Sequence, residues 1–202
     1  MSGGNEFGFS VRDKLNKIDE RVVHETFLAP ATASTTNIKS ATDISSGTLS
    51  LAAGDLTLTV LIHPRNIVIT TSDNASNDLV GTVTVTGTNQ FNETATETFT
   101  IVAETDTYTG SVAWISLTTV VGTFTTAAAS DTLSIGTGNK LGLSQKFRAA
   151  TDVFKGIANA ALQAPTGNAT YYTATFSTTP DGSKNFEVWY TSNQLSSNVY
   201  HG

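Results

Sequence analysis

The sequence predicts a mainly β protein, an antiparallel β-sandwich or a jelly-roll-like barrel, and three observations support this. Threonine supplies about 36 of the 202 residues, and its β-branched side chain suits the pleated, half-buried surface of a strand. From residue 55 onward, apolar residues alternate with polar ones, mostly threonine, at a period of two. Turn residues recur about every ten positions, as in sandwiches and barrels. No helical stretches separate these segments, which argues against a parallel α/β fold.

Composition and charge exclude several classes of function. The net charge is −6 and the pI is about 4.9, so the surface would repel a nucleic-acid backbone. The absence of cysteine excludes a disulfide framework, a thiolate nucleophile and a Cys-ligated metal site. The N-terminus lacks the pattern of a secretory signal, and no apolar run approaches the ~20 residues of a membrane helix. We therefore expect a soluble chain, made in the cytoplasm, that binds neither nucleic acid nor membrane.

Residues 1–54 are predicted to form a short N-terminal helix followed by an extended arm. Ser10 can cap a helix whose apolar residues recur every three or four positions over 11–22. A helix of about 13 residues is marginal alone in water, so it docks either on its own domain or on a neighbouring subunit. Residues 26–54 are rich in Ala, Ser and Thr, which favours an arm or a linker. The candidate protein-interface residues are Val11, Leu15, Ile18 and Val22 of the helix, followed by Phe27 and Leu28.

Residues 55–202 are predicted to form the β-sandwich domain. In the first expected strand Leu56, Leu58, Val60 and Ile62 share one face, and Pro64 ends the run because proline cannot donate to a ladder. Residues 147–162 fit either a helix or a strand, and Gly156 favours the strand because glycine costs a helix about 1 kcal/mol. The remaining expected strands are 67–69, 82–86 (ended by Gly87), 98–101, 112–126 and 133–135, and a hairpin of 172–176 and 186–190 around the turn Pro180-Asp181-Gly182.

Several motifs resemble chemical sites, but each has a simpler structural explanation. The glycine-rich run 136–142 lacks the following helix and the spacing of a phosphate-binding loop, so a β-turn is expected. The loop 73–78 carries four oxygen-bearing side chains, which could hold calcium but lack EF-hand spacing and more simply form a turn. The scattered histidines and glutamates show no catalytic arrangement, and Glu97 is expected to face solvent. The sequence therefore predicts no enzyme, no cofactor and no metal. The residues concerned are Asp73, Asn74, Asn77 and Asp78; His24, His63 and His201; and Glu93, Glu97 and Glu104.

Four segments carry a resemblance to a known group of proteins. They read PRNIVI at 64–69, GTVTVTGTN at 81–89, SIGTGNKLGL at 134–143 and STTPDGSK at 177–184. In this order and spacing, over roughly residues 60–191, the chain resembles the β-rich virion proteins of tailed phages and prophages. The resemblance implies a structural protein of the head, a decoration or cement protein on the capsid exterior. Its implied partners are the major capsid protein and other copies of itself in a homotrimer, and no catalytic residue is implied.

The alternative is a tail or vertex-associated protein whose β-domain binds glycans of a host receptor. Tail and vertex proteins share similar sandwiches, and aromatic side chains in loops commonly recognise sugars. The aromatic candidates are Tyr108, Trp114, Trp189 and Tyr190. Trp189 and Tyr190 fall in an expected strand, where we expect burial in the core more than exposure to a ligand.

Overall fold

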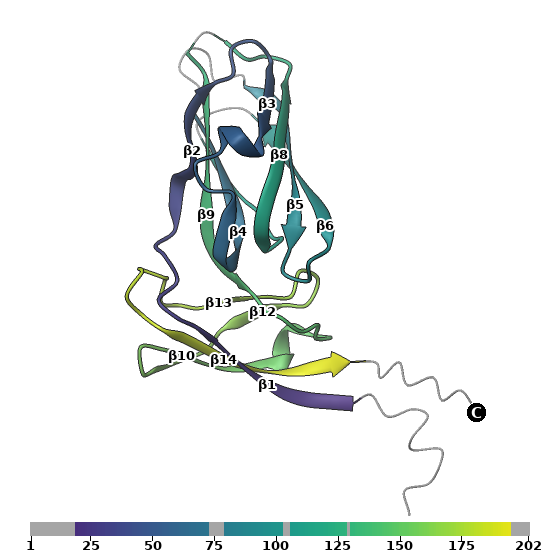
Figure 1. Ribbon diagram of the computed structural model, residues 1–202, viewed down its shortest axis with the longest axis vertical. Helices are drawn as coiled ribbons and strands as arrows, with labels where there is room; N and C mark the ends of the chain where they lie inside the picture. Colours follow the sequence, from purple (N-terminus) through teal and green to yellow (C-terminus); the bar gives the residue numbers. More distant parts are fainter. Residues whose placement is uncertain (1–18, 73–78, 103–105, 129, 195–202) are drawn as a thin grey trace, which may run out of the picture.

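The computed structural model describes residues 19–72, 79–102, 106–128 and 130–194. Apart from two 3-10 turns, Ala53–Asp55 and Ala150–Asp152, its regular elements are all strands (Figure 1). The prediction of a mainly β, antiparallel, sandwich-like fold is confirmed. The strands are β1 (Asp19–Phe27), β2 (Ser34–Asp43), β3 (Thr48–Ala52), β4 (Val60–Ser72), β5 (Val80–Asn89), β6 (Thr94–Val102), β7 (Thr107–Thr109), β8 (Trp114–Phe124), β9 (Thr132–Gly142), β10 (Val153–Ala158), β11 (Ala161–Gln163), β12 (Thr166–Asn168), β13 (Thr173–Thr175) and β14 (Phe186–Gln194).

The larger lobe is a sandwich made from eight strands of a ten-stranded hydrogen-bonded sheet that folds over on itself. One layer contains β3, β8, β5 and β6, and the other contains β2, β9, β4 and β7. Strand β4 joins the layers: Val60 pairs with Ser116 of β8, whereas the segment from Ile67 pairs with β9. A register shift against β8 lies between Val60 and Arg65, as expected for a bulge, and Arg65 pairs with both Trp114 of β8 and Leu141 of β9.

The core of the sandwich lies between these two layers. Alternating residues of β5, β6 and β8 point inward from the first layer, and their threonine neighbours lie on the other face. Isoleucine and leucine residues of β2, β4 and β9 meet them from the second layer. The strand expectations for 82–86, 98–101 and 112–126 are confirmed. The buried residues of this core include Ile38, Leu51, Ile67, Ile69, Val83, Val85, Phe99, Ile101, Trp114, Leu117, Val120, Phe124, Leu133 and Ile135.

The smaller lobe is a second layered unit below the sandwich in Figure 1. Its four-stranded sheet has the order β1-β14-β10-β11 and packs over the hairpin β12-β13, which pairs with the end of β9 at Leu141 and Gly142. Residues 147–162 contain β10 and β11, so the preference for strand over helix is confirmed. Aromatic residues from distant parts of the chain fill the space between the layers, chiefly Phe27, Phe147, Phe176, Phe186 and Tyr190.

The expectation for the N-terminal region is wrong over its described part. Residues 19–25 lie in strand β1 and not in a helix, because they complete the sheet beside β14; residues 1–18 lie outside the described residues. The predicted arm contains β2 and β3, and its apolar residues Ile38, Ile44, Leu49 and Leu51 are buried in the sandwich core. Few apolar residues suffice here because the rest of the core is supplied by other strands. Each of the two buried clusters contains residues from both 1–54 and 55–202.

Four further sequence expectations are wrong. Gly87 does not end the strand expected over 82–86, because β5 continues through it to Asn89. Pro64 does not end the first strand, because β4 runs through it where its register against β8 shifts. The glycine-rich run 136–142 is part of β9 and not a turn. The segments 173–175 and 186–194 do not pair as a hairpin: β13 and β14 lie in different sheets, with their apolar residues facing the same core. Gly182 adopts a positive φ of 80° in the connection between them.

Glycine in β9 is required by close packing. A Cβ atom on Gly136 would lie 1.7 Å from the backbone oxygen of Ser34 in β2, and one on Gly138 would lie 2.4 Å from the side-chain amide of Asn66. Backbone cannot yield at the first contact as a flexible side chain would. The glycines therefore let β2 and Asn66 pack directly against β9.

We predict that Gly136→Ala lowers the free energy of unfolding by about 3 kcal/mol because the new methyl group overlaps the backbone of β2. Gly54→Ala is the matched control, since a Cβ atom there meets no atom within 4 Å, and it should change stability by less than about 1 kcal/mol. Urea unfolding of the two variants and the parent chain measures both values. Equal stabilities would show that β2 does not pack on β9 as described.

Candidate functional site

The predicted interface residues fall in three different environments. Val11, Leu15 and Ile18 lie outside the described residues. Val22 of β1 is 66% exposed and Leu28, just after β1, is 64% exposed, whereas Phe27 is 4% exposed and packs in the core of the smaller lobe. Val22 and Leu28 are therefore available for contact with another molecule, and Phe27 is not.

Leu28 lies beside an apolar pocket at the junction of the two lobes. This junction pocket has a volume of about 300 Å³ and is lined mainly by Leu28, Leu58, Val60, Leu61 and Ile62. Val60 is 62% exposed and Ile62 is 94% exposed, although both are large and apolar. Three strongly exposed aliphatic side chains around one concavity are typical of a surface that contacts another protein.

The sequence predicts that Leu56, Leu58, Val60 and Ile62 share one face of a strand, but Leu56 is buried whereas Val60 and Ile62 are exposed. In this part of β4 the alternation is inverted, so that Leu61 is buried at 7% exposure between two exposed neighbours. The cause is that residues 56–59 are not in a strand and β4 begins only at Val60. The alternation of residues 56–59 therefore does not continue in register into β4. A one-residue change of register moves every side chain to the opposite face. Residues 60–62 are all apolar, so the sequence alone does not show which of them face the core. That depends on the register of β4.

Backbone carbonyl groups and two basic side chains form the rigid wall of the junction pocket. His63 Nε2 lies 2.9 Å from the backbone oxygen of Leu28. The guanidinium of Arg65 donates to the backbone oxygens of Ala31 and Gly138, and the side chain is only 3% exposed. Burial lowers the pKa of Arg65 to about 10, so the side chain remains protonated at neutral pH. A buried cation held by two carbonyl groups fixes the segment that leads from β1 to β2.

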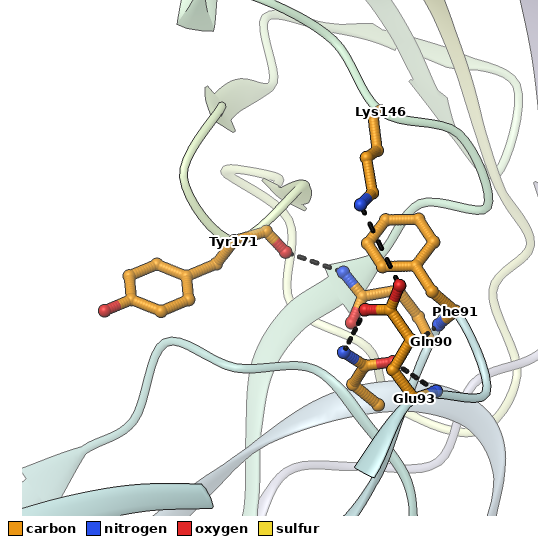
Figure 2. Close-up of polar contacts among 6 residues, drawn as sticks. Gln90, Phe91, Glu93, Lys146 and Tyr171 are labelled. Carbon is orange, nitrogen blue, oxygen red and sulfur yellow. Dashed lines mark hydrogen bonds and ion pairs between the residues drawn. The ribbon is translucent and has the colours of Figure 1, made fainter. Parts of the chain in front are cut away.

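A second contact between the lobes joins the β5–β6 turn to the smaller lobe (Figure 2). Gln90 Nε2 donates to the backbone oxygen of Tyr171 at 2.6 Å. Lys146 Nζ lies 3.9 Å from Glu93 Oε1 and 5.1 Å from the centre of the Phe91 ring. The ring of Tyr171 points away from the other labelled side chains in Figure 2. The polar groups of this cluster are thus used to connect the lobes, and the exposed ion pair adds little to stability.

The outer face of the four-stranded sheet carries a row of stacked side chains across three strands. His24 of β1 stacks on Trp189 of β14 with ring centres 4.1 Å apart and planes 6° apart, and its Nε2 lies 2.9 Å from Glu187 Oε2. Lys155 of β10 places its Nζ 4.4 Å from the centre of the Trp189 ring. Because β1 and β10 flank β14, both faces of the indole are covered.

The inner face of β1 is held by a buried phenol. Tyr190 is 0% exposed; its hydroxyl donates to Glu25 Oε1 and accepts from the backbone N–H of Gln145 at 3.1 Å. The same Glu25 oxygen accepts from the hydroxyl of Ser144 at 2.7 Å. Burial and, second, the hydrogen bond to Glu25 raise the pKa of Tyr190 well above its ordinary value of 10.0.

The remaining candidate chemical residues are separated or used structurally. His24 and His63 belong to different contacts, and His201, Glu104 and the 73–78 loop lie outside the described residues. Glu97 does not face solvent as expected: its Oε1 accepts from the backbone N–H groups of Ser111 and Val112 at 2.6 and 3.3 Å. In the described ranges, no three His, Cys, Asp or Glu residues are grouped as metal ligands. Within the same ranges, no helix has the length and apolar character needed to cross a membrane.

The aromatic residues considered for glycan binding are mostly inside the protein. Trp114 and Tyr190 are each 0% exposed, and Tyr108 packs against the sandwich core. Trp189 is partly exposed, but its ring faces are covered by His24 and Lys155. Comparison of the chain with protein-family models, with curated proteins and with solved structures gives no match.

We predict that Tyr190→Phe reduces stability by about 1–2 kcal/mol at neutral pH, because Glu25 and Gln145 lose their shared partner. Above pH 10 an unfolded tyrosine ionises while the folded Tyr190 keeps its proton, so the folded state binds more protons and stability falls as the pH rises. The parent chain should therefore lose about 1.4 kcal/mol more per pH unit than the variant above pH 10. Urea unfolding between pH 8 and 11 (roughly the window around that ordinary pKa) measures the two slopes, and parallel slopes would contradict the burial of the phenol.

Proposed function

We propose that this chain is a structural virion protein of a tailed phage, a decoration or cement protein that binds the assembled head and stabilises it. The proposal follows the resemblance of residues 60–191 to such proteins. The observation that carries it is the junction pocket, where Leu28, Val60 and Ile62 are between 62% and 94% exposed. These side chains contribute little to the fold of the isolated chain, so their apolar character is best explained by contact with another protein.

In this proposal the major capsid protein supplies an apolar side chain or short segment that enters the junction pocket. The wall held by Arg65 and His63 keeps the pocket open before binding, which reduces the ordering cost of association. A protein that binds the assembled shell and not the free subunit stabilises the shell by mass action. No chemical transformation is involved, so we expect no enzymatic activity and no cofactor.

The location that follows is the exterior of the capsid, after synthesis in the host cytoplasm. The sandwich lies at the other end of the long axis from the four-stranded sheet (Figure 1). Its exposed strand faces are largely threonine, and the chain carries a net charge of −6. A polar, acidic surface of this kind would limit association between particles. The homotrimer implied by the resemblance stays a prediction.

The runner-up is a tail or vertex protein that binds host glycans. Exposed aromatic side chains would carry that function, and Tyr171, at 38% exposure, is the most accessible aromatic ring of the lobe contact drawn in Figure 2. The polar groups beside Tyr171 already connect the lobes, so glycan binding has less support than the decoration role. A glycan array probed with the parent chain and with Tyr171→Ala distinguishes the two functions: retention of a glycan by the parent alone would favour the runner-up.

We predict that Val60→Glu and Ile62→Glu remove the protein from virus particles without unfolding it. Each substitution puts a charge beside the junction pocket, but the exposed position should keep stability within about 0.5 kcal/mol of the parent. Particles are produced from the genome that encodes this chain, purified, and their protein composition quantified. We expect at least about tenfold fewer copies per head, which corresponds to ~1.4 kcal/mol of lost binding.

Val102→Glu is the matched control, because Val102 is the same residue type with the same 62% exposure as Val60 but lies at the end of β6. It should leave the copy number unchanged. Absence of the parent chain from purified heads would refute the proposed function. Normal incorporation of both pocket variants would show that the shell is contacted elsewhere.

A further inference from the structure

Strand β1 is an open edge of the four-stranded sheet. It pairs with β14 over nine consecutive residues, from Asp19 to Phe27, without a register shift, and no other described strand pairs with it. It contains no proline. Its outward-facing positions include Val22, at 66% exposure, and His24. An open edge of this length and regularity presents unpaired N–H and C=O groups that another strand can bind.

Among the described strands, the other long edges are protected, and β1 has no such protection from a described residue. In β6, Glu97 points inward and its carboxylate binds the Ser111 and Val112 N–H groups, while the N–H of Val102 donates to the hydroxyl of Tyr108 at 3.1 Å. The edge strand β2 is interrupted by two register shifts against β9. An inward charge and irregular pairing are established ways of blocking strand addition. The contrast identifies β1 as the edge that is available for pairing.

The charge pattern of β1 matches a second copy of itself. In an antiparallel pair of identical strands, a twofold axis at Val23 places Arg21 opposite Glu25 of the second copy, and the same pair occurs again on the other side of the axis. It also places Val22 opposite His24 and allows all nine residues to pair. Moving the axis to residue 21 or 25 places Arg21 opposite Arg21, or Glu25 opposite Glu25. Opposite charges directly across a strand pair stabilise it, and like charges destabilise it.

The faces of the strand are also consistent with this register. Val23 and Glu25 lie on the inner side of β1, where Glu25 accepts hydrogen bonds from Tyr190 and Ser144. Arg21 is two residues before Val23 and therefore belongs to the same face of the strand. A carboxylate has about four acceptor positions, so Glu25 can also accept from a guanidinium across the axis. The Tyr190 contact fixes the Glu25 side chain beforehand, which lowers the entropy lost when the pair forms.

We propose that two copies of this chain associate through antiparallel pairing of β1 with β1 about a twofold axis at Val23. The two four-stranded sheets then form one continuous eight-stranded sheet with the order β11-β10-β14-β1 in each half. The interaction needs no shell protein and does not depend on the proposed function. It gives a closed dimer, in which each copy uses the same surface, and it is an alternative to the homotrimer that the resemblance implies.

Cysteine crosslinking tests the register, because the chain contains no cysteine. In Val23→Cys the two introduced thiols face each other across the axis, with Cα atoms about 4.5–5.5 Å apart, within the range of a disulfide. Thr26→Cys is the control: its partner position is residue 20, so the two copies of residue 26 lie roughly 20 Å apart. Under mild oxidation we expect a disulfide-linked dimer from the first variant and none from the second. Equal crosslinking of both, or of neither, would overturn the register.

Light scattering during gel filtration tests the dimer itself. The parent chain should elute with twice the chain mass of 21.2 kDa, whereas a monomer or a trimer over the whole concentration series would refute the proposal. Arg21→Glu replaces two attractive pairs with two repulsive ones and should weaken the dimer about tenfold or more. Arg148→Glu makes the same charge change at an exposed site outside β1 and should leave the dimer intact. Circular dichroism confirms that each variant is folded.

These results separate this inference from the proposed function. A dimeric protein that is absent from purified heads would leave the β1 pairing standing and refute the decoration role. A monomeric protein that is present on heads would do the reverse.

Discussion

The buried side chain of Arg65 is the constraint that fixes the chain segment between the two lobes. It is 3% exposed and donates to the carbonyl oxygens of Ala31 and Gly138, so one cation connects β4, the segment between β1 and β2, and the middle of β9. A buried charge is tolerated only when polar partners surround it, and breaking either bond would leave a buried N–H group and a carbonyl oxygen without a partner. The same side chain forms part of the junction pocket. The shape of that pocket therefore depends on the hydrogen bonds of Arg65.

The two surfaces that we assign to binding lie at opposite ends of one short segment. β1 ends at Phe27 in the core of the smaller lobe, and Leu28 follows immediately at the rim of the junction pocket. A dimer formed through β1 would present two junction pockets in a fixed relation. Once one pocket is occupied, the second binding event becomes intramolecular, which raises overall affinity without any new contact. Self-association and docking on a repetitive shell would thus reinforce each other.

The candidate site was only partly predictable from the sequence. Val22 and Leu28 are proposed as interface residues from the sequence and are exposed, but the helix assigned to Val22 is a strand. Val60 and Ile62 could not be found, because alternation specifies which residues share a face and not which face is buried. Arg65 gives no local signal, since its two carbonyl partners lie 34 and 73 residues away.

The sequence by itself determined the fold class and the strands with one solvated face. In β5, β6 and β8, threonine alternates with Val, Ile, Leu and Phe, and the burial of side chains follows this alternation, because each strand has water on one side and the core on the other. Only the tertiary structure decided the rest. The glycines of β9 lie in a strand because β2 and Asn66 pack directly on them, and β13 and β14 face one another across a core instead of pairing. Such choices depend on which distant segment supplies the neighbouring surface, and local periodicity contains no information about that partner.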